Sequence, residues 1–182
     1  ASKLYIDPKS VTLIQDAGHQ VNVYFRNGDG LDVETPSYDK NKIFDTWLNT
    51  DPKLGALFES NPPGFIQDLF RQAAQQSKDL EKADRFALAA KLAQGHGGLK
   101  SFADAENAVY YRPEDIAYAY IFARDNDHVL VLKLVKSSPG GYGHDCRVYF
   151  SDQAKRDAAL KTLSGPSAPP STLQPPPGPG LR

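Results

Sequence analysis

The chain has 182 residues, of which 40% are hydrophobic and 24% are charged, and its formal net charge is −1. This composition is typical of globular proteins, so it excludes a chain that is disordered throughout and argues against a strongly basic nucleic-acid binder. No apolar run of the sequence approaches the roughly 18 residues needed to cross a bilayer. The single cysteine excludes an internal disulfide and a multi-cysteine zinc site.

The first 50 residues are predicted to form a β-meander followed by a helix. A turn at 7–9 separates two short strands, and apolar residues alternate with polar ones over 20–25, as in a half-buried strand. The Asn-Gly-Asp-Gly sequence at 27–30 indicates a hairpin turn, because these residues accept positive φ angles. A returning strand and a helix capped by Ser37 or Asp39 complete this region.

Residues 51–108 are predicted to form a helical insertion. An Asp-Pro pair at 51–52 favours a helix start, and the Asn-Pro-Pro-Gly sequence at 61–64 ends that helix. The spacing of apolar residues then indicates two further helices, at about 65–76 and 78–94. A glycine-rich sequence stops the second of them.

Residues 109–163 return to the pattern of strands and one helix. We expect strands at 116–122, 128–135 and 146–150, followed by a final helix at 152–163. A glycine-rich loop at 137–143 joins two of these strands.

The two β-rich regions match each other at nearly constant offsets. Residues 4–11 match 109–116 at an offset of 105, Val21 and Val23 match Val129 and Val131 at 108, and the segment 33–48 matches at 115. The sequence therefore predicts an α+β fold with two pseudo-repeated antiparallel β-meander-plus-helix halves that share a sheet or core, and a helical insertion between them. Because identities are few, a chance match of two hairpin-plus-helix segments is the alternative.

Residues 164–182 form a proline-rich tail, whose composition predicts disorder with extended polyproline II geometry. Such segments can bind aromatic-lined grooves. The expected organisation is therefore 1–50, 51–108, 109–163 and this tail.

An aromatic strand is the first candidate site. Tyr118, Tyr120 and Phe122 are spaced two apart, so they lie on one face of a strand, and Arg147 is a nearby cation. Aromatic sheets with surrounding cations stack single-stranded bases, whereas the same side chains also suit a packing surface or a subunit interface. Since the strands are poor in Lys and Arg, we favour packing or an interface.

The segment 137–146 is the second candidate site and includes Tyr142 and His144. His144 and Cys146 would share a strand face, as in a histidine-activated thiolate. Neighbours on one face are roughly 6–7 Å apart, which is long for a hydrogen bond. Cys146 also continues an apolar alternation, so we interpret it as a core residue.

No catalytic residue, metal ligand or cofactor motif stands out in the sequence. We expect a non-enzymatic binding or assembly module that acts through protein–protein contacts or self-association, for instance as a homodimer. Single-stranded nucleic-acid binding and an enzyme with a site near 137–146 are the alternatives. The N-terminus shows no secretory signal pattern, so we expect a cytoplasmic protein without a membrane partner. The candidate binding residues are Tyr118, Tyr120, Phe122, Tyr142, His144 and Arg147.

Overall fold

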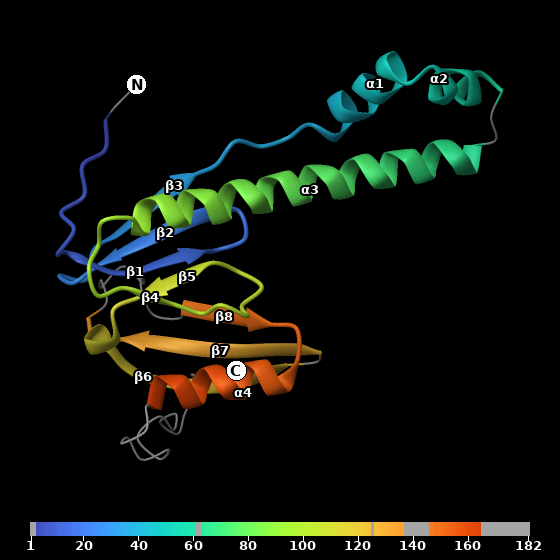
Figure 1. Cartoon of the computed structure of the whole chain (residues 1–182). Coiled ribbons are helices and arrows are strands. Elements are labelled where there is room, and N and C mark those ends of the chain that lie inside the picture. Colours follow the sequence, from blue (N-terminus) through green and yellow to red (C-terminus); the bar gives the residue numbers. More distant parts are fainter. Residues whose placement is uncertain (1–2, 61–62, 125, 137–145, 165–182) are drawn as a thin grey trace. The chain divides into compact units, whose positions relative to one another are not determined.

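The computed structural model describes residues 3–60, 63–124, 126–136 and 146–164 (Figure 1). Over these residues it contains four α-helices and two antiparallel sheets, which confirms the predicted mixed α+β class. The chain divides into a sheet unit, Ala1–Glu34 with Phe86–Arg182, and a helical unit, Thr35–Arg85. The predicted proline-rich tail lies outside the described residues from 165 onward.

The first sheet of the sheet unit has five strands in the order β3-β2-β1-β5-β4. The turns after β1 and β2 contain Gly18 and Gly28, whose φ angles of 94° and 97° favour glycine. The second of these turns is the hairpin predicted from the Asn-Gly-Asp-Gly sequence. The strands are β1 (Val11–Asp16), β2 (Gln20–Phe25), β3 (Gly30–Glu34), β4 (Lys100–Ser101) and β5 (Val109–Tyr111).

Strand β1 is buried along its whole length, because both of its faces are covered. On one face Val11 and Ile14 pack in a cluster with Ala89, which lies near the end of α3 (Pro63–Ala93). On the other face Leu13 belongs to a separate cluster. The buried amide of Gln15 donates a 3.2 Å hydrogen bond to the Arg147 carbonyl, so this polar side chain is satisfied.

The second sheet has three strands in the order β6-β7-β8. Side chains of β7 alternate between its two faces: Leu130 and Leu132 face the cluster that contains Leu13, whereas Val129 and Val131 face the opposite side. Helix α4 lies along this sheet (Figure 1). The elements are a 3₁₀ helix η1 (Pro113–Asp115), β6 (Ile116–Arg124), β7 (Asp127–Leu134), β8 (Cys146–Phe150) and α4 (Gln153–Ser164).

The two sheets share one hydrophobic core with α4. Phe102 connects them, because its ring stacks on Tyr111 at 4.8 Å and meets Phe150 edge-on at 6.3 Å. Asn107 adds a polar link: its Nδ2 donates to the Arg147 carbonyl at 2.9 Å, and its Oδ1 accepts from the Tyr149 amide at 2.9 Å. Ala159, Leu160 and Leu163 of α4 pack against the same cluster.

The helical unit contains α1 (Lys40–Thr50), α2 (Pro52–Glu59) and the part of α3 up to Arg85. The predicted caps are confirmed at Asp39, whose carboxylate accepts from the Asn41 amide, and at Asp51, which caps α2. The core cluster of this unit has three buried residues, which are Phe44, Leu69 and Ala73.

The prediction of two helices at about 65–76 and 78–94 is wrong, because α3 runs unbroken from Pro63 to Ala93. No glycine or proline stands between 65 and 93 to interrupt it. Ser77 lies at the expected break, and its hydroxyl donates a 2.6 Å hydrogen bond to the Tyr38 carbonyl. This partner lets a serine occupy a helix interior without competing for the helix backbone.

Candidate contact surfaces

The structure brings four of the six predicted site residues together on one face of the three-stranded sheet. The rings of Tyr118 and Tyr120 stack with centroids 6.2 Å apart and planes at 25°. The guanidinium carbon of Arg147 lies 5.1 Å from the centroid of the Phe122 ring, which is a cation–π distance. The other two, Tyr142 and His144, lie outside the described residues.

Most of this aromatic face is buried. Tyr120 and Phe122 are exposed by 2% and 5%, and they form a cluster with Val129 and Val131, whereas Tyr118 is partly exposed. A base can stack only on a ring whose face is accessible. In this arrangement the aromatic residues therefore behave as packing residues rather than as an open stacking surface.

Cys146 is buried in the core shared by the two sheets, which confirms its interpretation as a core residue. A thiolate nucleophile needs a partly exposed, electropositive environment, which this position does not offer. Across the part of the chain that the structure describes, no group of three or more His, Cys, Asp or Glu could hold a metal ion.

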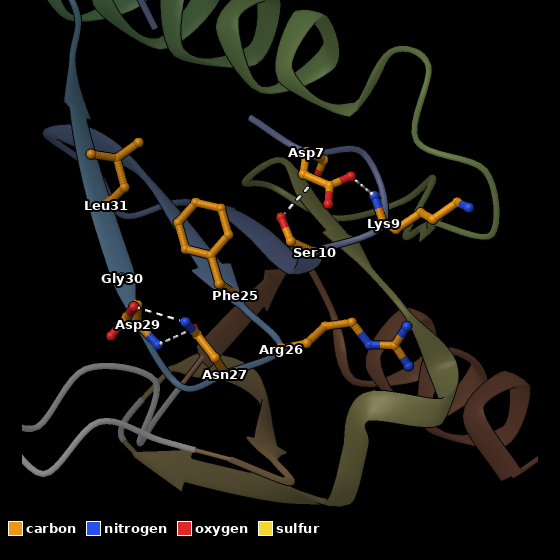
Figure 2. Close-up of a pocket in the computed structure, with 9 residues that line it drawn as sticks. All are labelled: Asp7, Lys9, Ser10, Phe25, Arg26, Asn27, Asp29, Gly30 and Leu31. Atoms are coloured by element: carbon orange, nitrogen blue, oxygen red, sulfur yellow. Dashed lines mark hydrogen bonds between the residues drawn. The ribbon is translucent and has the colours of Figure 1, made fainter. Parts of the chain in front are cut away.

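A groove of about 840 Å³ lies beside the turn that precedes β1 (Figure 2). Its polar groups serve the local turns: an Asp7 carboxylate oxygen accepts from the Lys9 amide at 3.1 Å, and Asn27 donates to Asp29 at 2.9 Å. Phe25 supplies an apolar surface. The lining residues are Asp7, Lys9, Ser10, Phe25, Arg26, Asn27, Asp29, Gly30 and Leu31.

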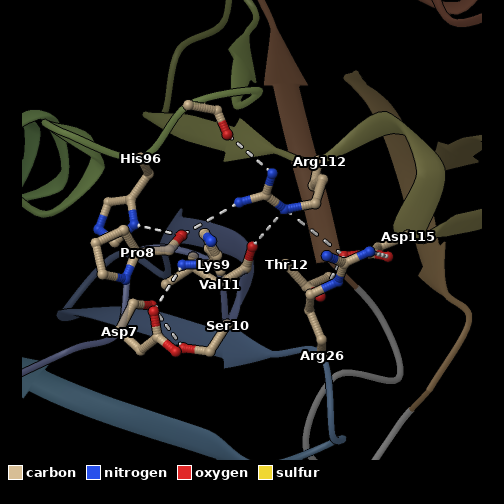
Figure 3. A network of polar contacts seen from close by, with 11 residues as sticks. Asp7, Pro8, Lys9, Ser10, Val11, Thr12, Arg26, His96, Arg112 and Asp115 are labelled. Carbon is tan, nitrogen blue, oxygen red and sulfur yellow. Dashed lines mark hydrogen bonds and ion pairs between the residues drawn. The ribbon is translucent and has the colours of Figure 1, made fainter.

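A buried arginine joins three segments next to this groove (Figure 3). Arg112 follows β5, and its Nε donates to the Val11 carbonyl at 3.0 Å. Its Nη1 donates to the Gly97 carbonyl at 2.9 Å, and its Nη2 donates to the Pro8 carbonyl at 3.3 Å. The Pro8 carbonyl also lies 2.9 Å from Nδ1 of His96. Arg112 therefore fixes the turn before β1 and the loop after α3.

Asp115 continues this network toward β1 and β2. Its carboxylate accepts a 2.9 Å hydrogen bond from the Thr12 hydroxyl and forms a 3.1 Å ion pair with Nε of Arg26. Sequence patterns do not single out Arg112 or Asp115 as site residues, because both stand in a polar turn. Their contacts serve the fold, and they present no nucleophile with a general base beside it.

Apolar side chains are exposed on the helical unit, where they extend its small core to the surface. Phe44 stacks on Phe70 with ring centroids 4.1 Å apart and planes at 14°, and it meets Phe58 edge-on at 6.2 Å. Leu57, Phe58 and Phe70 are exposed by 47%, 40% and 37%. We call these three residues the helical apolar surface.

The segment before β1 is the second exposed apolar feature. Tyr5 is exposed by 83% and Leu4 by more than half, whereas Ile6 is partly buried against the cluster on the α3 face of the first sheet. This segment was predicted to form a strand. In the structure, residues 4–6 stand outside the strands of both sheets (Figure 1).

Tyr38 connects the start of the helical unit to α3. Its amide donates to Glu81 at 3.2 Å and its hydroxyl donates to Asp84 at 2.7 Å. The hydrogen bond to Asp84 raises the pKa of Tyr38, with further contributions from burial and from the charge of that carboxylate.

Comparison of the chain with known protein families, curated proteins and solved structures finds no match. None of the helices in the described ranges is long and apolar enough to span a membrane. The function is therefore argued from the surfaces themselves.

Proposed function

We propose that this chain is a non-enzymatic assembly module that associates with itself through the helical unit. The observation that carries the proposal is the helical apolar surface, in which three large apolar side chains are exposed and two of them contact the same core ring, Phe44. Grouped exposed apolar residues mark contact sites, whereas single ones are normal on any surface.

The size of the core beneath this surface supports the proposal. A small unit buries too little surface to be stable without further contacts. Among the described residues of Thr35–Arg85, the core cluster has three buried residues, one of them alanine, and the apolar residues packed against it are only partly buried. Covering Leu57, Phe58 and Phe70 with the same surface of a second copy would enlarge this core.

The charges also suit self-association. Three charged side chains of α3 have partners within the helix, in the 2.6 Å ion pair of Asp68 with Arg71 and the 2.9 Å hydrogen bond from Gln75 to Asp79. The formal net charge of −1 opposes the approach of two copies very little.

The proposal is tested by the double substitution Leu57→Ser and Phe58→Ser. Both side chains are substantially exposed, so the change removes the contact surface while the buried core residues stay in place. We expect the dissociation constant for self-association, measured by sedimentation equilibrium, to rise at least about tenfold, which corresponds to roughly 1.4 kcal/mol.

Val135→Ser is the matched control for this experiment. Val135 is an exposed apolar residue of the sheet unit, and it lies far in sequence from the helical unit, which ends at Arg85. The proposed surface would be contradicted if Val135→Ser raised the dissociation constant as much as the double substitution does. It would also be contradicted if the double substitution left the dissociation constant unchanged.

We also infer that the two β-meanders are repeats of one unit. The turn before each is closed by a 3.0 Å backbone hydrogen bond, from the Ser10 amide to the Asp7 carbonyl and from the Asp115 amide to the Arg112 carbonyl. Each turn leads into a ladder with a register shift at its start, after Val11 in β1 and after Ile116, 105 residues later, in β6.

The ladders refine the correspondence of β2 with β7. Ile14 pairs with Val23, and Ala119, 105 residues after Ile14, pairs with Leu132. By the ladders, β2 and β7 therefore correspond at an offset of 109 residues. This is one more than the offset of 108 at which Val23 matches Val131 in the sequence. The helix that packs on β1 and β2 is the end of α3, while α4 packs on β6–β8 and α1 belongs to the helical unit. Experimental coordinates in which 11–25 and 116–134 do not superpose would refute the repeat.

The nucleic-acid alternative has less support. It needs aromatic rings and cations together on an accessible face. Tyr120 and Phe122 are buried, and the guanidinium of Arg147 lies over the Phe122 ring. A base could reach these rings only by displacing what covers them.

A further inference from the structure

We infer that residues 4–6 of one copy pair as a β-strand with the outer edge of β6 in a second copy of the chain. The pairing would be reciprocal, because each copy carries both the donated segment and the accepting edge. This contact uses the sheet unit and is independent of the helical apolar surface.

The first observation is the counterpart of residues 4–6 in the other meander. Three residues before the turn at Asp7 stand Leu4-Tyr5-Ile6, and three residues before the turn at Arg112 stand Val109-Tyr110-Tyr111. The second set forms β5, which pairs with β1, the first full strand of the other meander. The repeat relation therefore pairs residues 4–6 with the first full strand of the second meander, which is β6.

The second observation is the position of β6. It forms an edge of the described three-stranded sheet, in the order β6-β7-β8, and it is nine residues long. Long edge strands can pair with another chain unless something protects them. Its counterpart β1, by contrast, lies between β2 and β5 in the five-stranded sheet.

The third observation is the anchoring of the donated segment within its own copy. Ile6 packs on the α3 face of the first sheet, whereas β6 lies beyond the opposite face, across the shared core. The Pro8 carbonyl is held by Arg112 and lies against His96 (Figure 3). Because Ile6 is held on the α3 face of its own copy, we infer that the accepting β6 belongs to a second copy.

The pairing register follows from the β1–β5 ladder. There Tyr111 lies opposite Leu13, and Tyr110 lies opposite Ile14. A shift of 105 residues places Ile6 opposite Tyr118 and Tyr5 opposite Ala119. A small residue opposite Tyr5 leaves room for its ring, which is the most exposed apolar side chain of the described segment.

Hydrogen exchange in the full-length chain tests the pairing directly. The helical double variant Leu57→Ser/Phe58→Ser is used, so that contact through the helical apolar surface does not contribute. We expect the amides of Tyr5 and Asp7, which correspond to the donating positions Tyr110 and Arg112 of the β1–β5 ladder, to be protected at high protein concentration and to lose this protection on dilution. Unprotected amides at every concentration would overturn the inference, and would leave the proposal for the helical unit intact.

Two substitutions at Tyr5 separate backbone pairing from simple apolar contact. Tyr5→Pro removes the N–H donor and should raise the dissociation constant at least about tenfold in the same background. Tyr5→Ser keeps that donor and should have a smaller effect. Equal effects of the two changes would indicate a contact made by the ring alone and would refute strand pairing.

A cross-linking experiment identifies the accepting strand and its copy. A chain carrying Ile6→Cys is mixed with a chain carrying Tyr118→Cys, and opposite positions of a ladder lie close enough for a disulfide. We expect a cross-linked heterodimer, and none when Val135→Cys replaces Tyr118→Cys. A chain carrying both substitutions that instead forms the bond within itself would overturn the exchange between copies.

Discussion

At the scale of single residues, Arg112 links three segments of the sheet unit. Its guanidinium donates to the carbonyls of Val11, Gly97 and Pro8, and it is almost fully buried. A buried carbonyl without a donor costs free energy, and this guanidinium satisfies the buried Val11 carbonyl together with the partly buried carbonyls of Gly97 and Pro8.

Arg112→Met should therefore destabilise the chain by roughly 2–4 kcal/mol, because it leaves three carbonyls without this donor. The free energy of unfolding from urea denaturation measures the effect. Arg71→Met is the control, since Arg71 forms an exposed ion pair with Asp68 that should contribute less than about 1 kcal/mol. Similar losses for both variants would contradict the role of Arg112.

Gly98 gives a second prediction at this scale. Its φ is 89°, and a Cβ added there would lie 2.9 Å from Nη1 of Arg112. Gly98→Ala should cost roughly 1–2 kcal/mol through backbone strain and displacement of that guanidinium group. Gly97→Ala is the matched neighbour, because nothing lies within 4 Å of its added Cβ. In thermal denaturation we expect a lowered melting temperature for Gly98→Ala only.

Neither role could be predicted from the sequence, although the Gly-rich stop itself was recognised. The carbonyls that Arg112 binds belong to residues 15 to 104 positions away, and backbone carbonyls have no residue type that a pattern could reveal. Cys146, by contrast, was assigned to the core correctly, because strand alternation is local information.

At the scale of elements, the sequence predicted most strands and the helix caps correctly. It did not predict which elements pack against one another. The hairpin before β3 and the caps of α1 and α2 depend on residues within a few positions of each other. The strand predicted at 4–6 lies outside both sheets, and the helix break predicted near Ser77 is absent. Both outcomes depend on contacts with parts of the chain that are distant in sequence.

The link between Tyr38 and α3 yields a prediction for pH dependence. Folding favours the protonated tyrosine, because a hydrogen bond to Asp84 raises its pKa above 10.0. This stabilisation is complete below pH 10.0 and is lost as pH rises through the raised pKa. Tyr38→Phe should lower the urea midpoint of unfolding at neutral pH. As the solution becomes alkaline, its free energy of unfolding should fall less than that of the wild type.

Wild type and Tyr38→Phe must be compared over the same pH series. Burial also raises the pKa of Tyr111, but that contribution is common to both proteins and cancels in the difference. If the free energy of unfolding changes with pH in parallel for the two proteins, the contact with Asp84 does not affect the titration of Tyr38.

At the scale of the whole molecule, the exposed apolar residues point to assembly. Among the described residues they gather in two places, the helical apolar surface and the segment before β1 with Tyr5 at its centre, whereas Val135 and Tyr149 are single exposed residues of the sheet unit. Composition could not locate them, because the same residue types also fill the cores. The aromatic strand, which the sequence indicated as the first candidate site, is mostly buried. We therefore favour the helical apolar surface as the contact surface.

Sedimentation equilibrium of the wild-type chain over a wide concentration range is the decisive experiment for self-association. We expect a weight-average mass that rises from the monomer value of 20.0 kDa as concentration increases, and that rises less for Leu57→Ser/Phe58→Ser. A wild-type mass that stays at 20.0 kDa up to the highest concentration would contradict it.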